Sequence, residues 1–151
     1  MTIDICIDPG VGGAIAWRQM LGSSLARNCP DTPLGQIDLL RGLKADAELF
    51  GLGLRCVVEE VGYMPGDGGR GVWTFASNDA TWWAGLLALG IPCRRVRPQK
   101  WQKFVGGLPK DYDDRKRALK AFSQARWPDV KVTLANADAL AMLAVFEKLW
   151  D

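Results

Sequence analysis

The 151-residue chain contains no histidine. This absence excludes Ser-His-Asp and Cys-His catalysis, and it excludes every zinc site that uses imidazole ligands. The four cysteines form no Cys-x-x-Cys pair, and we interpret them as small buried thiols rather than as redox or metal ligands. Any catalysis must therefore depend on carboxylates, lysines, hydroxyl groups or the backbone.

Long apolar runs are also missing. No run reaches the length of about 18 residues that a membrane span requires, so we expect no membrane segment. The first ten residues, MTIDICIDPG, place Asp4 and Asp8 inside the first apolar stretch, which does not fit a secretory signal peptide. We therefore expect a cytoplasmic protein. The net charge of +2 is too small to indicate nucleic-acid binding by itself.

The pattern of apolar residues predicts one α/β domain of three layers over residues 1–151. Strands are expected at 3–8, 12–17, 24–29, 54–60 and 91–96. Helices are expected at 33–50, 72–89, 98–104, 111–127 and 134–150. A glycine-rich loop is expected over residues 62–71, which hold five glycines in ten positions.

Three acidic residues lie in apolar settings, where an unused carboxylate is costly. Asp8 and Glu59 each follow a short apolar run at the expected carboxyl end of a strand, which is where ligands bind in open α/β sheets. Asp138 lies in a helix that reads as buried, and a lone carboxylate there is destabilising unless it is paired or bound to metal. In a chain without histidine, three converging carboxylates favour a hard cation such as Mg²⁺ or Mn²⁺.

Each acid also has a structural interpretation. Asp8 is a possible cap of the following Pro-Gly turn, and Asp138 is a possible first-turn acid facing the helix dipole. Strand alternation directs only one of Glu59 and Glu60 towards the site. The three acids together favour the metal site.

Basic residues are concentrated in one segment. Eleven of the 19 lysines and arginines fall between positions 94 and 126. A solvated helix face is one interpretation, because acidic residues lie among them. A surface for a phosphate backbone, beside the acidic site, is the interpretation that we favour.

Four motifs, in order, resemble those of RuvC-type Holliday junction resolvases, and they look most like the short phage-encoded members. They are IDPGVGGAIA, VVEEVGYMPGDG, VRPQKWQK and ANADALAMLA, and they are spread from residue 7 to residue 144, so that the resemblance extends over nearly the whole chain. The resemblance implies a ribonuclease H-like fold, with a five-stranded mixed sheet flanked by helices. It implies a homodimer that cuts four-way DNA junctions with Mg²⁺, in the cytoplasm of a bacterial host if the chain is phage-encoded. No small-molecule cofactor is expected.

The resemblance also implies roles for individual residues. Asp8, Glu59 and Asp138 match the catalytic acids that hold the metal, with Mn²⁺ as a substitute for Mg²⁺. Further possible metal ligands are Glu60 and Asn136. The residues expected to contact DNA are Tyr63, Met64, Arg70, Arg97, Lys100, Lys103 and Lys116.

One departure from the family pattern concerns a fourth acid, which the family usually carries three or four residues before the acid that matches Asp138. Leu134 and Ala135 occupy those positions here. A non-catalytic module that binds branched DNA is therefore an alternative function. An actin-like or sugar-kinase-like phosphate loop at Asp8–Gly13 is disfavoured, since that superfamily needs a second such motif and a far longer chain.

The helix expected at 72–89 carries two apolar stripes. A surface helix needs only one apolar face to pack on its own sheet. We therefore expect the second stripe to form a dimer interface, with either Trp73 or Trp83 buried between subunits. Coverage by another helix of the same chain is the alternative.

Overall fold

Hydrogen bonding between the first and fourth strands organises the sheet. A computed structural model of the chain describes residues 1–19, 22–62, 66 and 68–151. The strands are β1 (Thr2–Asp8), β2 (Ala14–Arg18), β3 (Ser24–Asn28), β4 (Gly53–Glu59) and β5 (Cys93–Val96), in the spatial order β3-β2-β1-β4-β5. The pairs β1–β2 and β2–β3 are antiparallel, and the pairs β1–β4 and β4–β5 are parallel. The predicted five-stranded mixed sheet is therefore confirmed.

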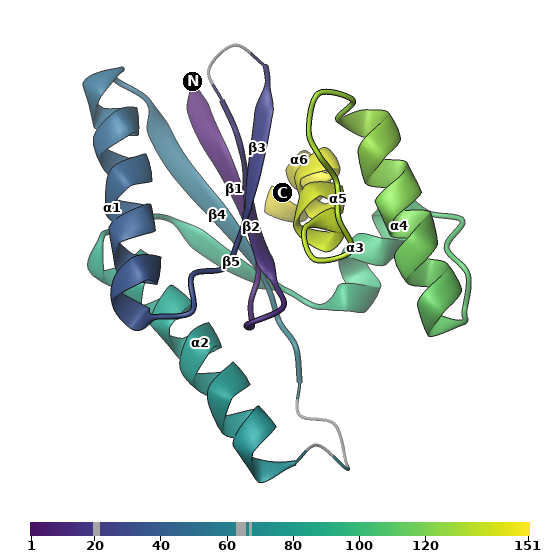
Figure 1. The fold of residues 1–151 in the computed structure, drawn as a ribbon. Coiled ribbons are helices and arrows are strands. Elements are labelled where there is room, and N and C mark those ends of the chain that lie inside the picture. The colour runs from purple at the N-terminus through teal and green to yellow at the C-terminus, as the bar shows by residue number, and fades with distance from the viewer. Residues whose placement is uncertain (20–21, 63–65, 67) are drawn as a thin grey trace.

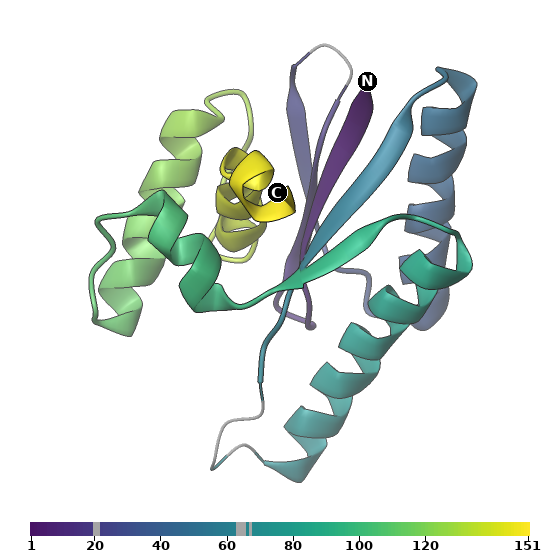
Figure 2. The same cartoon turned by 180° about the vertical axis from the view of Figure 1, so that it is seen from behind.

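Helices cover both faces of this sheet (Figures 1 and 2). On one face lie α1 (Pro33–Leu49) and α2 (Gly69–Ala88). On the other face lie α3 (Pro98–Val105), α4 (Tyr112–Arg126), α5 (Ala137–Ala144) and α6 (Phe146–Trp150). The sheet and the two helical layers form the three-layer α/β arrangement that the sequence predicted. Within the described ranges, no helix has both the length and the apolar character needed to cross a membrane.

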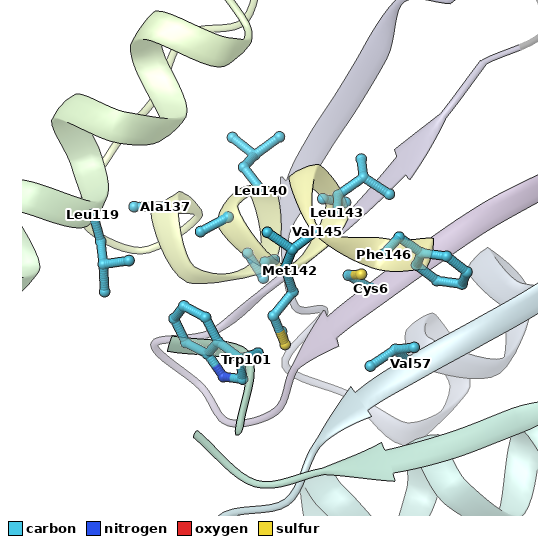
Figure 3. Close-up of a cluster of buried hydrophobic side chains, with 14 of the residues drawn as sticks. Cys6, Val57, Trp101, Leu119, Ala137, Leu140, Met142, Leu143, Val145 and Phe146 are labelled. Carbon is cyan, nitrogen blue, oxygen red and sulfur yellow. The ribbon is translucent and has the colours of Figure 1, made fainter. Parts of the chain in front are cut away.

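Two apolar cores follow from strand alternation, because successive side chains point to opposite faces. Ile3, Ile5 and Ile7 of β1 pack towards α1 and α2. Cys6 packs towards α5, together with Val57 of β4. Figure 3 shows this second core, where Trp101 of α3 and Met142 of α5 lie side by side above the sheet. The cysteines are all free thiols, as expected.

Two elements differ from their predicted bounds by three residues or more. The expected helix 134–150 is wrong: residues 134–136 form a turn, and the helix is divided at Val145 into α5 and α6. The backbone of Val145 leaves the helical region (φ −108°, ψ 15°), which lets Phe146 turn into the core and stack on Trp150. No proline or glycine marks this break in the sequence. Helix α2 begins at Gly69, inside the predicted glycine-rich loop.

Candidate active site

The carboxylates of Asp8 and Glu59 meet because β1 and β4 are parallel and in register. Ile7 pairs with Val58, so Asp8 and Glu59 follow at the same edge of the sheet and on the same face. Glu59 is buried at 5% exposure, and Asp8 is partly exposed. This confirms the expectation that both strands present an acid at their carboxyl ends.

Asp138 reaches the same place from the helical layer that packs on this face of the sheet. It lies in the first turn of α5, which packs on β1 and β2. Its side chain and those of Asp8, Glu59 and Lys116 line one hollow of about 470 Å³, whose floor is the turn from Pro9 to Gly13. The structure therefore brings together the three acids that the sequence singled out, and it adds a lysine.

The turn after Asp8 is held in place by close packing and by one hydrogen bond. A Cβ atom on Gly13 would stand 2.0 Å from the Asp8 carbonyl oxygen, so only glycine fits there. The backbone N–H of Gly10 donates to Oδ1 of Asn78, a buried residue of α2, at 2.9 Å. Asn78 was not among the residues singled out from the sequence, where nothing distinguishes it from other polar residues of a helix.

A tryptophan fixes the Glu59 carboxylate. The indole N–H of Trp101, which is completely buried, donates to Oε1 of Glu59 at 2.9 Å. Trp101 is the tryptophan of the motif VRPQKWQK, but no role was predicted for it from the sequence. A signal was present, because a buried tryptophan usually needs an acceptor for its N–H.

The hollow holds a strong concentration of negative charge. Burial raises the pKa of Asp8 well above its ordinary value, and the charge of Glu59 raises it further. Burial likewise raises the pKa of Glu59, although hydrogen bonds from Asp8 and Trp101 favour its ionised form. Burial and the neighbouring charge thus raise the pKa of Asp8 strongly, whereas the hydrogen bonds to Glu59 oppose the rise in its pKa.

Lys116 of α4 supplies the positive charge in the hollow. Its Nζ lies 2.6 Å from Oδ2 of Asp138. Burial alone would lower the pKa of Lys116, but the hydrogen bond and the charge of Asp138, with the charge of Asp8, raise it above its ordinary value. Lys116, expected from the sequence to contact DNA, thus lies inside the acidic site as a charged ammonium.

The donor set fits a hard divalent cation. Oδ1 of Asp138 is buried and has no hydrogen-bond partner among the described residues. An unpartnered carboxylate oxygen beside two more carboxylates suits Mg²⁺ or Mn²⁺. In the described part of the chain, no three acidic, histidine or cysteine side chains form a ready-made ion site. A cation would have to compete with the hydrogen bond between Asp8 and Glu59 and with the contact between Lys116 and Asp138.

The two additional candidate ligands lie elsewhere. Glu60 is half-exposed, and its carboxylate faces Arg97 at 3.8 Å, as strand alternation predicts for the neighbour of Glu59. Oδ1 of Asn136 accepts a hydrogen bond from the backbone N–H of Thr133, and its Nδ2 donates to the carbonyl of Lys131. Leu134 and Ala135 precede α5, so they are not on the helix that carries Asp138.

A second hollow of about 780 Å³ adjoins the acidic one and shares Val61 and Pro98 with it. Arg97 and Lys100 lie on its wall with exposed side chains. Lys103 is exposed on α3, and Arg70 is exposed in the first turn of α2. Tyr63 and Met64 lie outside the described residues.

Several other basic residues of the segment 94–126 are engaged within the fold. Arg95 donates twice to Asp79 and lies over the Trp83 ring, and Arg94 lies over Trp150. Arg117 pairs with Asp114 on the surface of α4. The exposed basic surface near the acids is therefore smaller than the count of lysines and arginines suggests.

The sheet order and the two helical layers define the ribonuclease H-like class of α/β folds, as predicted. Two solved structures of RuvC from Thermus thermophilus share it. The structure described as RuvC in complex with Holliday junction substrate has a TM-score of 0.62 and 11% identity, covering 99% of this chain and 96% of that one. A second RuvC structure has a TM-score of 0.54 and 14% identity, covering 99% and 97%.

No family model matches the sequence, and no curated protein matches it. The likeness to RuvC, at 11–14% identity, establishes the fold. The RuvC-type, ribonuclease H-like architecture implied by the four motifs is therefore confirmed.

Two aspartates of β1, Asp4 and Asp8, should respond oppositely to the same substitution. Because the pKa of Asp8 is raised on folding, its contribution to stability falls as the pH rises above about 4, the ordinary pKa of an aspartate. Asp8→Asn should therefore raise the melting temperature at pH 7, by roughly 2–4 °C for each kcal/mol gained. The gain should shrink as the pH approaches 4.

Asp4 provides the matched control. It is more deeply buried than Asp8, and it pairs with Arg55 at 2.7 Å and Arg18 at 3.4 Å. Asp4→Asn should lower the free energy of unfolding by about 1–3 kcal/mol, because it weakens hydrogen bonds to charged groups. Thermal melts of both variants at pH 4, 5.5 and 7 check the pair. A lower melting temperature for Asp8→Asn at pH 7 would contradict the assignment of a repulsive cluster.

Proposed function

We propose that this protein is an endonuclease that cuts four-way and related branched DNA junctions, using Mg²⁺ or Mn²⁺. The observation that carries this proposal is that four charged side chains, those of Asp8, Glu59, Asp138 and Lys116, line one hollow. The second hollow, with the exposed Arg97 and Lys100 on its wall, adjoins it. The similarity to a RuvC structure that contains Holliday junction substrate supports the choice of substrate.

Each side chain has a chemical role in this proposal. Asp8, Glu59 and Asp138 would hold the cation, and Trp101 keeps one Glu59 oxygen in a fixed position. A bound divalent cation supplies Lewis acidity at the phosphate and lowers the pKa of bound water. Arg97 and Lys100, on the wall of the second hollow, would bind the phosphate backbone and align the DNA strand with the acids.

Cleavage is tested with a labelled synthetic four-way junction, incubated with and without Mg²⁺. Asp8→Asn, Glu59→Gln and Asp138→Asn should each abolish cleavage, because the amides cannot hold the cation. Junction binding should persist in a gel-shift assay, since each change removes negative charge that repels DNA. If Asp138→Asn cleaves at the parental rate, the assignment of the site is wrong. If the parental protein binds the junction but never cuts it, the non-catalytic module is the better description.

The DNA path is tested by the salt dependence of junction binding. Replacing Arg97 and Lys100 by alanine should weaken binding and flatten the plot of log affinity against log salt, by roughly one unit per lost phosphate contact. The control variant replaces Arg41 and Lys44 of α1 by alanine. It loses the same two positive charges, but on the face of the sheet away from α3. A slope that changes equally in both double variants would place the DNA elsewhere.

We also propose a homodimer, because paired cuts on a two-fold symmetric junction need two symmetric sites. Support comes from α2, whose buried face presents Trp82 and Leu86 to the core. Its outer face carries a continuous line of exposed apolar and small residues, namely Trp73, Ala76, Ala80, Ala84 and Leu87. Trp73 is 75% exposed, while Trp83 is half-buried and lies under Arg95. Trp73 is therefore the better anchor between subunits.

Sedimentation at micromolar concentration should show a particle of twice the 16.6 kDa chain mass. Trp73→Glu should yield a folded monomer, because this side chain makes little contact with its own chain. The control Leu34→Glu, at a position that is 66% exposed on α1, should stay dimeric. A parental protein that sediments as a monomer both alone and on junction DNA would refute the dimer.

A further inference from the structure

The contact between Lys116 and Asp138 is not required to attach α4 to α5. The Ser123 hydroxyl donates to the carbonyl of Ala137 at 2.9 Å, and the Trp127 indole N–H donates to the carbonyl of Leu140 at 3.1 Å. Both bonds are buried and join the same two helices. Lys116 instead extends from α4 into the acidic hollow, where Nζ approaches Oδ2 of Asp138 at 2.6 Å.

The position of the lysine is suited to movement. Its side chain is 25% exposed, whereas that of Asp138 is only 11% exposed. The lysine side chain is thus more accessible to solvent than its partner, and its ammonium is carried on a flexible four-carbon stem. The lysine can turn outwards without disturbing the packing of α4, while Asp138 stays fixed in the first turn of α5.

We infer that Lys116 is a resident counter-ion of the acidic site, which competes with the divalent cation for Asp138 until a substrate phosphate draws the ammonium away. The inference rests on the proposed function, because it takes the acidic hollow to be the cation site. It adds a form of regulation, in which the DNA-free protein binds the cation weakly and DNA makes the site available.

The physical reason is charge. An ammonium and a divalent cation on the same carboxylate repel each other, and the repulsion is strong because the hollow is partly closed to water. A phosphodiester offers the ammonium an alternative anion of the kind that lysine binds well. Moving the ammonium to the phosphate leaves both Asp138 oxygens available, including the unpartnered Oδ1. Cation binding and DNA binding are then thermodynamically linked, and each strengthens the other.

The test measures Mn²⁺ binding to the DNA-free protein, from the electron paramagnetic resonance signal of free Mn²⁺. Lys116→Met should bind Mn²⁺ at least about tenfold more tightly than the parental protein, which corresponds to about 1.4 kcal/mol. Lys116→Arg, which keeps the positive charge, should retain the weak parental affinity. A thermal melt of each variant establishes that it is folded.

The matched control is Lys120→Met, one helical turn further along α4 at an exposed position. It removes the same charge from the same helix without opening the Asp138 contact, so its Mn²⁺ affinity should stay within about twofold of the parental value. If Lys116→Met binds no more tightly than the parental protein, or if Lys120→Met gains equally, the inference is overturned.

These outcomes are separate from those of the cleavage assay. A protein that cuts junction DNA while Lys116→Met shows no gain would retain the proposed function and lose this inference. A gain in Mn²⁺ affinity without any cleavage of branched DNA would retain the competition at Asp138 and refute the nuclease. Absence of Mn²⁺ binding in every variant would overturn the inference, and the junction assay with Mg²⁺ would still decide the function.

Discussion

The registered parallel pairing of β1 with β4 is the constraint on which the other features depend. It alternates side chains between two cores, so that isoleucines face α1 and α2 while Cys6 and Val57 face α5. The same register ends both strands together, and this places Asp8 beside Glu59. A slip of one residue would send every side chain of one strand to the opposite face and separate these two acids.

The first strand also shows how the protein treats buried charge in two ways. At its start, Asp4 is neutralised by Arg55 and Arg18, and Arg55 additionally stacks on Phe146. At its end, Asp8 has a carboxylate as its neighbour, and burial and the charge of Glu59 raise its pKa. The first arrangement stabilises the fold, whereas the second retains a destabilising group that the proposed cation would neutralise. Such local costs are typical of functional sites.

Local signals account for what the sequence predicted. The Pro-Gly turn after an apolar run located the end of β1. The apolar surroundings of Asp138 indicated a carboxylate that is either paired or bound to metal. Alternation required that only one of Glu59 and Glu60 face the site, and the resemblance to the resolvases favoured Glu59. Apart from that choice, these inferences need only the period of a strand or helix and the cost of burying a charge.

What the sequence did not predict depends on packing between distant segments. The contact of Lys116 with Asp138 requires the packing of α4 against α5, to which Ser123 and Trp127 contribute buried hydrogen bonds. The bond from Trp101 to Glu59 requires the position of α3 over the sheet. The division of the last helix at Val145 also has no local sequence signal, since neither proline nor glycine marks it. The early start of α2 at Gly69 ran against the low helix propensity of glycine.

Helix α2 has a geometric consequence that follows from its two faces. On its inner side, Asn78 holds the turn that follows Asp8, and Gln36 of α1 donates to the Asn78 carbonyl. On its outer side runs the line from Trp73 to Leu87 that the proposed dimer would bury. In the proposed dimer, this single helix would therefore connect the subunit interface to the first acid of each site. The angle at which the two copies of α2 cross would then set the distance between the two active sites.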